Sequence, residues 1–264
     1  MKNISSFERL LTIMDELREK CPWDQKQTMD SLSHLTIEET YELIDAILIK
    51  DMTEIKGELG DLLLHIVFYS KIASESNHFN INDVIRSVSE KLIERHPHIY
   101  GNEVATTEEQ VKRNWEKIKL KKGRKSVLEG VPKSLPAMVK ATRIQEKARG
   151  VGFDWENASQ VLEKVKEEFT ELNHEVNQEN NSTKIEKEFG DVLFSLINYA
   201  RFIGVDPESA LERTNKKFIS RFSFLENEIK EKGLNFESMN LQEMDEIWNK
   251  SKKIHPYFYF FIFI

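Results

Sequence analysis

The chain has 264 residues, of which 39% are hydrophobic and 31% are charged, and its formal net charge is −7. This length fits one large domain or two ordinary ones, and the negative balance weighs against a nucleic-acid binder that works by bulk charge. No apolar run approaches the roughly 20 residues that a membrane-spanning helix needs. The single cysteine, Cys21, cannot form an intrachain disulfide, which fits a reducing cytosol. From the charge, the apolar runs and the cysteine content together, we expect a cytoplasmic protein that binds neither membranes nor nucleic acid.

Apolar residues recur at helical spacing along the chain, and this periodicity predicts an all-α fold. The clearest apolar faces lie within 43–48, 55–67 and 161–176. Helix starts are predicted at Thr106-x-x-Glu109, which has the pattern of a capping box, and at Asp206-Pro207, an N-cap followed by proline. We find no convincing strand pattern of alternating polar and apolar residues.

The segment 122–136 interrupts this helical pattern. It contains Gly123, Gly130, Pro132 and Pro136, a composition typical of a linker. We therefore expect an N-terminal domain over 1–121 and a C-terminal domain over 137–255. The remaining residues, 256–264, form an aromatic tail to which the sequence assigns no role.

Four motifs occur once on each side of the predicted linker, in the same order and offset by 126 to 133 residues. A repeat of this kind indicates two tandem copies of one helical domain. The pairs are Glu38-Glu39-x-x-Glu42 with Glu167-Glu168-x-x-Glu171, Glu58-x-Gly60-Asp61 with Glu188-x-Gly190-Asp191, Lys91/Arg95 with Lys217/Arg221, and Trp115 with Trp248.

The acidic motifs predict a metal site in each copy. Carboxylates three or four residues apart share one helix face, so two antiparallel helices can aim four of them at one point. Without a cation such a cluster is repulsive, and oxygen ligands of this kind suit Mg²⁺. A single motif would more often be a solvated acidic face. Gly60 and Gly190, which are costly inside helices, are explained if another helix approaches closely beside the acids.

The basic and aromatic motifs suit a nucleotide. A lysine and an arginine on one helix face can contact the phosphates of a triphosphate, although ordinary surface charge is the simpler interpretation of either pair alone. A tryptophan such as Trp248 can stack on a nucleobase, and packing in a core or interface is the alternative.

Together these motifs resemble the tandem-domain MazG nucleotide pyrophosphohydrolases. The resemblance extends to segments 21–28, 94–101, 114–119 and 151–154, and it covers nearly the whole chain except the tail. It implies small helical bundles that pair with another copy, a homodimer, and a cytoplasmic enzyme. The implied reaction is Mg²⁺-dependent cleavage of NTPs or dNTPs to NMP and pyrophosphate by water attack at the α-phosphorus, with Mn²⁺ as a possible substitute for Mg²⁺.

Carried over by position, the resemblance also implies functional residues. The metal ligands in the second copy would be Glu168, Glu171, Glu188 and Asp191, and the matching set in the first copy is Glu39, Glu42, Glu58 and Asp61. Phosphates would be held by Lys184, Lys217 and Arg221, with Lys164 and Lys187 as further candidates. Trp248 would meet the base or ribose, and Glu167 or Glu168 is a candidate acceptor of the water proton.

The second copy is the better candidate for catalysis. It has Lys184 four residues before Glu188, whereas the first copy has Glu54 four residues before Glu58. A positive residue suits a triphosphate and a glutamate does not. Two alternatives stay open: a narrower substrate such as dCTP, dUTP or phosphoribosyl-ATP, and a module that senses nucleotides without turnover.

Overall fold

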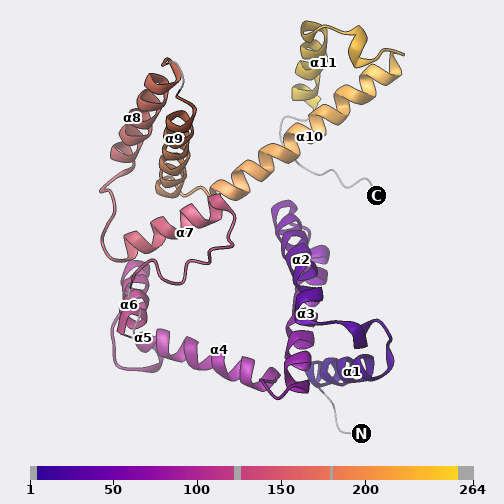
Figure 1. Ribbon diagram of the computed structural model, residues 1–264, viewed down its shortest axis with the longest axis vertical. Coiled ribbons are helices and arrows are strands. Elements are labelled where there is room, and N and C mark those ends of the chain that lie inside the picture. The colour runs from indigo at the N-terminus through magenta and orange to yellow at the C-terminus, as the bar shows by residue number, and fades with distance from the viewer. Residues whose placement is uncertain (1–4, 122–125, 179–180, 255–264) are drawn as a thin grey trace. The chain divides into compact units, whose positions relative to one another are not determined.

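The structure is a computed structural model that describes residues 5–121, 126–178 and 181–254 (Figure 1). Every regular element in these ranges is a helix, which confirms the predicted all-α class. None of the described helices is both long and apolar enough to cross a membrane. The aromatic tail predicted at 256–264 lies outside the described residues.

The chain divides into two compact units, Met1–Ala105 and Thr106–Ile264. This division falls earlier than the predicted linker at 122–136. The reason is that helix α6 (Glu108–Lys121) packs against α7 (Ala137–Gly150) and therefore belongs with the second unit. The exact domain boundaries stay a prediction.

The first unit is organised around a hairpin of two long helices. Its elements are α1 (Ser6–Lys20), η1 (Asp24–Lys26), α2 (Met29–Ile49), α3 (Met52–Glu75), α4 (Ile81–Arg95) and α5 (Pro97–Tyr100). Only two residues separate α2 from α3. Lys50 ends α2 in the left-handed conformation, at φ 61°, and the Asp51 side chain caps α3 by accepting hydrogen bonds from the Thr53 and Glu54 amides. This tight turn holds the two helices side by side.

The core of the first unit lies where α1 packs against the hairpin. Met14, Leu32, Val67 and Phe68 are each at most 2% exposed. Arg18 braces the same region, because its guanidinium donates to Glu75 at the end of α3 and to the backbone carbonyls of Asp24 and Gln27. The first hairpin is thereby anchored at the end away from its turn.

The second unit repeats the hairpin and adds helices on either side. Its further elements are α8 (Ala158–Val176), α9 (Ser182–Phe202), α10 (Pro207–Glu231), η2 (Phe236–Ser238) and α11 (Leu241–Ile254). Helices α8 and α9 form the hairpin, and α7 packs on α9, where the Gln145 amide donates to the Phe194 carbonyl at 2.8 Å. Helix α11 packs on α10 through Leu225, Ile229 and Ile247.

The two predicted helix starts have different outcomes. The start at Asp206 is confirmed, since its side chain accepts a hydrogen bond from the Ser209 amide and Pro207 is the first residue of α10. The capping box at Thr106 is wrong by one residue. The Thr107 hydroxyl accepts from the Gln110 amide, and the Gln110 side chain in turn accepts from the Thr106 amide.

Both hairpins leave a long apolar face exposed. On α3 this face includes Leu59, Leu63 and Ile66, and at corresponding positions on α9 it includes Phe189, Leu193 and Leu196; these six side chains are 39% to 54% exposed. The close helix approach expected at Gly60 and Gly190 is not present among the described residues, because an added Cβ at either position would meet none of their atoms within 4 Å. The expectation is therefore wrong for the single chain, where both glycines border open space.

Candidate active site

The α8–α9 hairpin brings three predicted metal ligands together. Glu168 and Glu171 lie on α8 and Glu188 lies on α9, and one carboxylate oxygen from each lies within 4.8 Å of the others. Glu168 and Glu188 are only 7% and 9% exposed, whereas Glu171 is exposed. The fourth predicted ligand, Asp191, is one turn further along α9 and is not part of this group of three. We call Glu168, Glu171 and Glu188 the second cluster.

Two lysines contact the acids around the second cluster. The Lys164 ammonium lies 2.7 Å from a carboxylate oxygen of Glu167 and 2.7 Å from one of Glu168. The Lys187 ammonium lies 2.8 Å from Glu188 and 3.4 Å from Asp191. The hydrogen bonds that both lysines donate to these carboxylates raise the pKa of the two ammonium groups, which are cationic at neutral pH.

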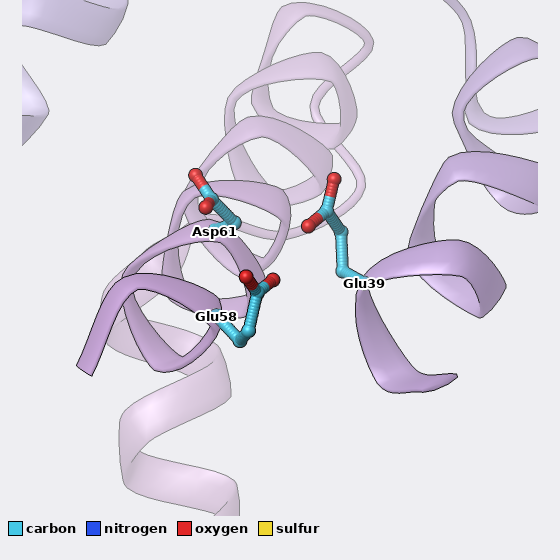
Figure 2. A group of neighbouring side chains, drawn as sticks. All are labelled: Glu39, Glu58 and Asp61. Atoms are coloured by element: carbon cyan, nitrogen blue, oxygen red, sulfur yellow. The ribbon is translucent and has the colours of Figure 1, made fainter. Parts of the chain in front are cut away.

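The α2–α3 hairpin holds a matching group. Figure 2 shows the carboxylate of Glu39 on α2 pointing toward those of Glu58 and Asp61 on α3. One oxygen from each again lies within 4.8 Å of the others. Here the aspartate is included and Glu42 is outside the group, so each hairpin gathers three of the four predicted acids. We call Glu39, Glu58 and Asp61 the first cluster.

Crowding changes the acid–base behaviour of the first copy. Desolvation, followed by repulsion from neighbouring carboxylates, raises the pKa of Glu39, Glu42 and Glu58 above the ordinary value of 4.5. Negative charge gathered in this way is stabilised by a bound cation.

Both clusters fit a hard divalent cation. One carboxylate oxygen of Glu58 and one of Glu188 are buried and have no hydrogen-bond partner among the described residues. A buried oxygen without a partner is costly unless a ligand satisfies it. An all-oxygen set from two facing helices is the donor chemistry that Mg²⁺ prefers.

The remaining predicted residues lie outside the clusters. The Lys184 ammonium is near the hairpin tip, 3.6 Å from a Glu175 oxygen, and its side chain is largely exposed. Lys217 and Arg221 lie four residues apart on α10 and are partly buried. Trp248 lies on α11, where its ring packs against Phe218 with centroids 5.1 Å apart. Each hairpin thus brings its own acids together, whereas the basic pair lies on α10 and Trp248 lies on α11.

Sequence reasoning missed the pairing of Lys164 and Lys187 with the acids. The signal was present, because Lys164 precedes Glu167 and Glu168 by three and four residues, and Lys187 precedes Asp191 by four. It also missed the ion pair in which Arg201 on α9 donates to both carboxylate oxygens of Asp154, so tying the start of the second copy to its hairpin. No local spacing reveals a contact between residues so far apart in the chain.

Comparison with known proteins supports the duplicated arrangement. The sequence model of the MazG nucleotide pyrophosphohydrolase domain matches this chain twice, at 27–100 and 156–223. Each match contains one hairpin, its acidic cluster and the basic pair of that copy, which is Lys91 and Arg95 in the first and Lys217 and Arg221 in the second. Trp248 lies beyond the second match. The predicted tandem repeat is therefore confirmed.

Relatives match the chain over nearly its whole length. A protein of Escherichia coli (strain K12) named nucleoside triphosphate pyrophosphohydrolase is 40% identical over 258 residues, which cover 95% of this chain and 98% of the relative. A Thermotoga maritima protein named nucleoside triphosphate pyrophosphohydrolase/pyrophosphatase MazG is 45% identical over 93% of this chain and 95% of its own length. The uncharacterized protein YabN of Bacillus subtilis (strain 168) is 44% identical over 94% of this chain and 52% of its own. Because the domain model matches twice and the Escherichia coli and Thermotoga maritima relatives align over nearly their full length, the chain belongs to the MazG nucleotide pyrophosphohydrolase family.

Proposed function

We propose that this protein hydrolyses nucleoside triphosphates, both NTPs and dNTPs, to NMP and pyrophosphate. The observation that carries the proposal is the second cluster, three carboxylates from two helices within 4.8 Å of one another, inside a segment matched by the MazG domain. The names of the full-length relatives agree with this reaction. The cytoplasmic location stays a prediction.

The cation at this site is proposed to be Mg²⁺, with Mn²⁺ as a substitute. Glu168, Glu171 and Glu188 would hold it, and Asp191, one turn from Glu188, would join them. When bound, a divalent cation lowers the pKa of a coordinated water and polarises a phosphoryl oxygen. The carboxylates supply the negative charge that keeps the cation in place.

Other side chains would handle the nucleotide and the proton. Lys217 and Arg221 share one face of α10, where they would bind the phosphates and stabilise the charge that develops on departing pyrophosphate. Glu167 is largely exposed and Glu168 is buried, and either would accept the proton of the attacking water. Trp248, which packs against Phe218, would contact the base or ribose.

The protein is proposed to act as a homodimer. The apolar faces of α3 and α9 are exposed in the single chain, and Gly60 and Gly190 lie open on these same helices. Glycine inside a helix costs about 1 kcal/mol relative to alanine, a cost that close contact with a second helix would explain. Pairing each hairpin with one from a second copy would bury these faces in a four-helix bundle.

The second copy is proposed to be the main catalytic site. Lys164 and Lys187 contact its cluster, and Lys184 lies nearer the hairpin tip. The first copy has Leu35, Gly57 and Glu54 at the corresponding positions. Positive charge beside the metal suits a substrate that carries three phosphates. The first cluster with Glu42 is a second possible metal set.

One experiment tests the reaction and the choice of copy. The purified full-length protein is incubated with each NTP and dNTP, with and without Mg²⁺, and products are separated by ion-exchange chromatography. Glu188→Gln removes one charge from the second cluster, and Glu58→Gln is the matched change in the first. We expect Mg²⁺-dependent NMP and pyrophosphate, and at least about 100-fold slower turnover for Glu188→Gln only, because one well-placed electrostatic group contributes roughly that much.

The other outcomes are equally informative. Activity that survives in Glu188→Gln and is lost in Glu58→Gln would move catalysis to the first copy. Formation of NDP and phosphate would overturn cleavage between the α- and β-phosphates. Binding of nucleotide with Mg²⁺ and without any turnover would replace the enzyme by a sensing module.

A further inference from the structure

The second cluster already carries two positive charges supplied by the chain itself. Lys164 lies 2.7 Å from a Glu168 oxygen, and Lys187 lies 2.8 Å from a Glu188 oxygen. Glu168 and Glu188 are also the two buried members of the cluster. The two lysines therefore contact the two buried carboxylates that would be ligands of a bound cation.

The first copy lacks both charges at the corresponding positions. Leu35 stands where the second copy has Lys164, and Leu35 packs against the core of the first unit. Gly57 stands where the second copy has Lys187. The two hairpins each gather three acids but differ in whether the chain itself supplies neutralising charge.

A bound divalent cation would lie close to both ammonium groups, although Lys187 contacts only one oxygen of Glu188 and leaves the other, buried oxygen without a partner among the described residues. Metal ligand distances are about 2.0–2.6 Å, so a cation on the Glu168 and Glu188 oxygens would lie within a few ångströms of both ammonium groups and repel them. Both lysines can move away, because their side chains are 34% and 68% exposed and their stems are flexible. Once displaced, they lie beside the cation, where the phosphates would be.

Building on the proposed function, we propose that Lys164 and Lys187 are exchangeable counterions of the second cluster. They neutralise Glu168 and Glu188 when no metal is bound, and they are displaced onto the phosphates when metal and nucleotide enter. This competition weakens metal binding when nucleotide is absent. When a triphosphate binds, its phosphates pair with the ammonium groups of Lys164 and Lys187, and the competition ends. The site therefore favours the metal–nucleotide complex over the free cation.

The test measures binding of Mn²⁺ alone, by electron paramagnetic resonance of the free ion, to the full-length protein. All variants carry Glu58→Gln, so that the first cluster is disabled. Lys164→Gln and Lys187→Gln are each expected to bind Mn²⁺ about fivefold to tenfold more tightly, since each removes one charge near a partly exposed metal site. Lys166→Gln is the matched control, because Lys166 is on the same helix and pairs with Glu163 instead of the cluster.

A second measurement follows the lysines directly. Brief acetylation with an amine-reactive ester, read by mass spectrometry, is expected to modify Lys164 and Lys187 faster after Mn²⁺ is added, while Lys166 is unchanged. This readout uses the Glu58→Gln protein without lysine changes, so it does not depend on whether a lysine variant folds.

Failure of this inference can be separated from failure of the proposed function. Suppose Mn²⁺ binds and Glu171→Gln abolishes the binding, but the lysine variants bind no more tightly and acetylation rates do not change. The counterion role is then wrong while the metal site stands. If neither the Glu58→Gln protein nor its lysine variants bind Mn²⁺ at millimolar concentration, the metal site at the second cluster is wrong, and with it the proposed placement of catalysis in the second copy.

Discussion

At the scale of single residues, Arg18 shows how one side chain can fix the geometry of a unit. Its guanidinium donates two hydrogen bonds to Glu75, at 2.9 and 2.6 Å, and also reaches the carbonyls of Asp24 and Gln27. Helix α1, the following turn and the end of α3 are thereby joined at one point. The hydrogen bonds from Arg18 lower the pKa of the Glu75 carboxyl below its ordinary value of 4.5.

This lowered pKa leads to a stability prediction with a defined sign. A carboxyl with a depressed folded-state pKa stabilises the fold above its unfolded value of 4.5, and this stabilisation is lost as the pH falls through the lowered value. We expect Glu75→Gln to reduce the free energy of unfolding at pH 7 by about 0.5–1 kcal/mol, because partly exposed ion pairs contribute little. Urea denaturation of wild type and variant at several pH values measures the difference.

The difference should shrink as the pH falls below 4.5. Glu146→Gln is a control, because its partner Arg143 lies one turn away on the same helix and both side chains are exposed. A difference between wild type and Glu75→Gln that stays constant down to pH 3 would show that the pairing with Arg18 is not what stabilises this unit.

At the scale of helices, the sequence was most informative where spacing alone decides the structure. The helix periodicity predicted the all-α class, and carboxylates three and four residues apart predicted which acids share a helix face. Residues such as Glu39 and Glu58 meet because two adjacent helices form a hairpin. The acidic motifs recur in the same order in both copies, and this repeat indicated one such hairpin in each copy.

Spacing could not decide how side chains share the space between helices. It predicted four acids at one point, but three converge in each hairpin, with Asp61 included in the first and Asp191 outside the second. The difference accompanies the ammonium of Lys187, which contacts both Glu188 and Asp191. Similarly, the cap of α6 depends on side-chain rotamers, so that Thr107 caps the helix although Thr106 fits the pattern.

The helix-interior glycines support a prediction about self-association. In an isolated chain, Gly190→Ala would stabilise helix α9 by about 1 kcal/mol, because a Cβ there meets nothing within 4 Å. If α9 packs closely on a second copy, the same methyl group obstructs the contact. We expect Gly190→Ala, and likewise Gly60→Ala, to weaken dimer formation in sedimentation equilibrium experiments.

Lys184→Ala, at an exposed position on the opposite side of the same helix, is the control for a change that leaves the apolar face intact. A Gly190→Ala protein that keeps wild-type association and unfolds at a higher temperature would show that the glycine does not lie at the dimer contact.

At the scale of the whole molecule, the two compact units raise the question of where the second one begins. Helix α6 packs against α7, although the composition of 122–136 predicted a linker between them. A fragment covering 106–264 retains this contact and a fragment covering 122–264 does not. We expect the longer fragment to unfold at a higher temperature, measured by circular dichroism.

Metal-dependent hydrolysis by the longer fragment would further agree with catalysis in the second copy. Equal unfolding temperatures for the two fragments would instead show that α6 contributes nothing to the second unit and would favour the boundary predicted at 122–136.

The two-residue turn at Lys50 and Asp51 has a consequence for how the chain folds during synthesis. Contacts between α2 and α3 join residues close in sequence, and structures built from such local contacts form quickly. The first hairpin, complete at Glu75, can therefore form while the second copy is still being translated. Two hairpins built on the same motifs in one chain can exchange partners, and early closure of the first protects newly made protein from that misassembly.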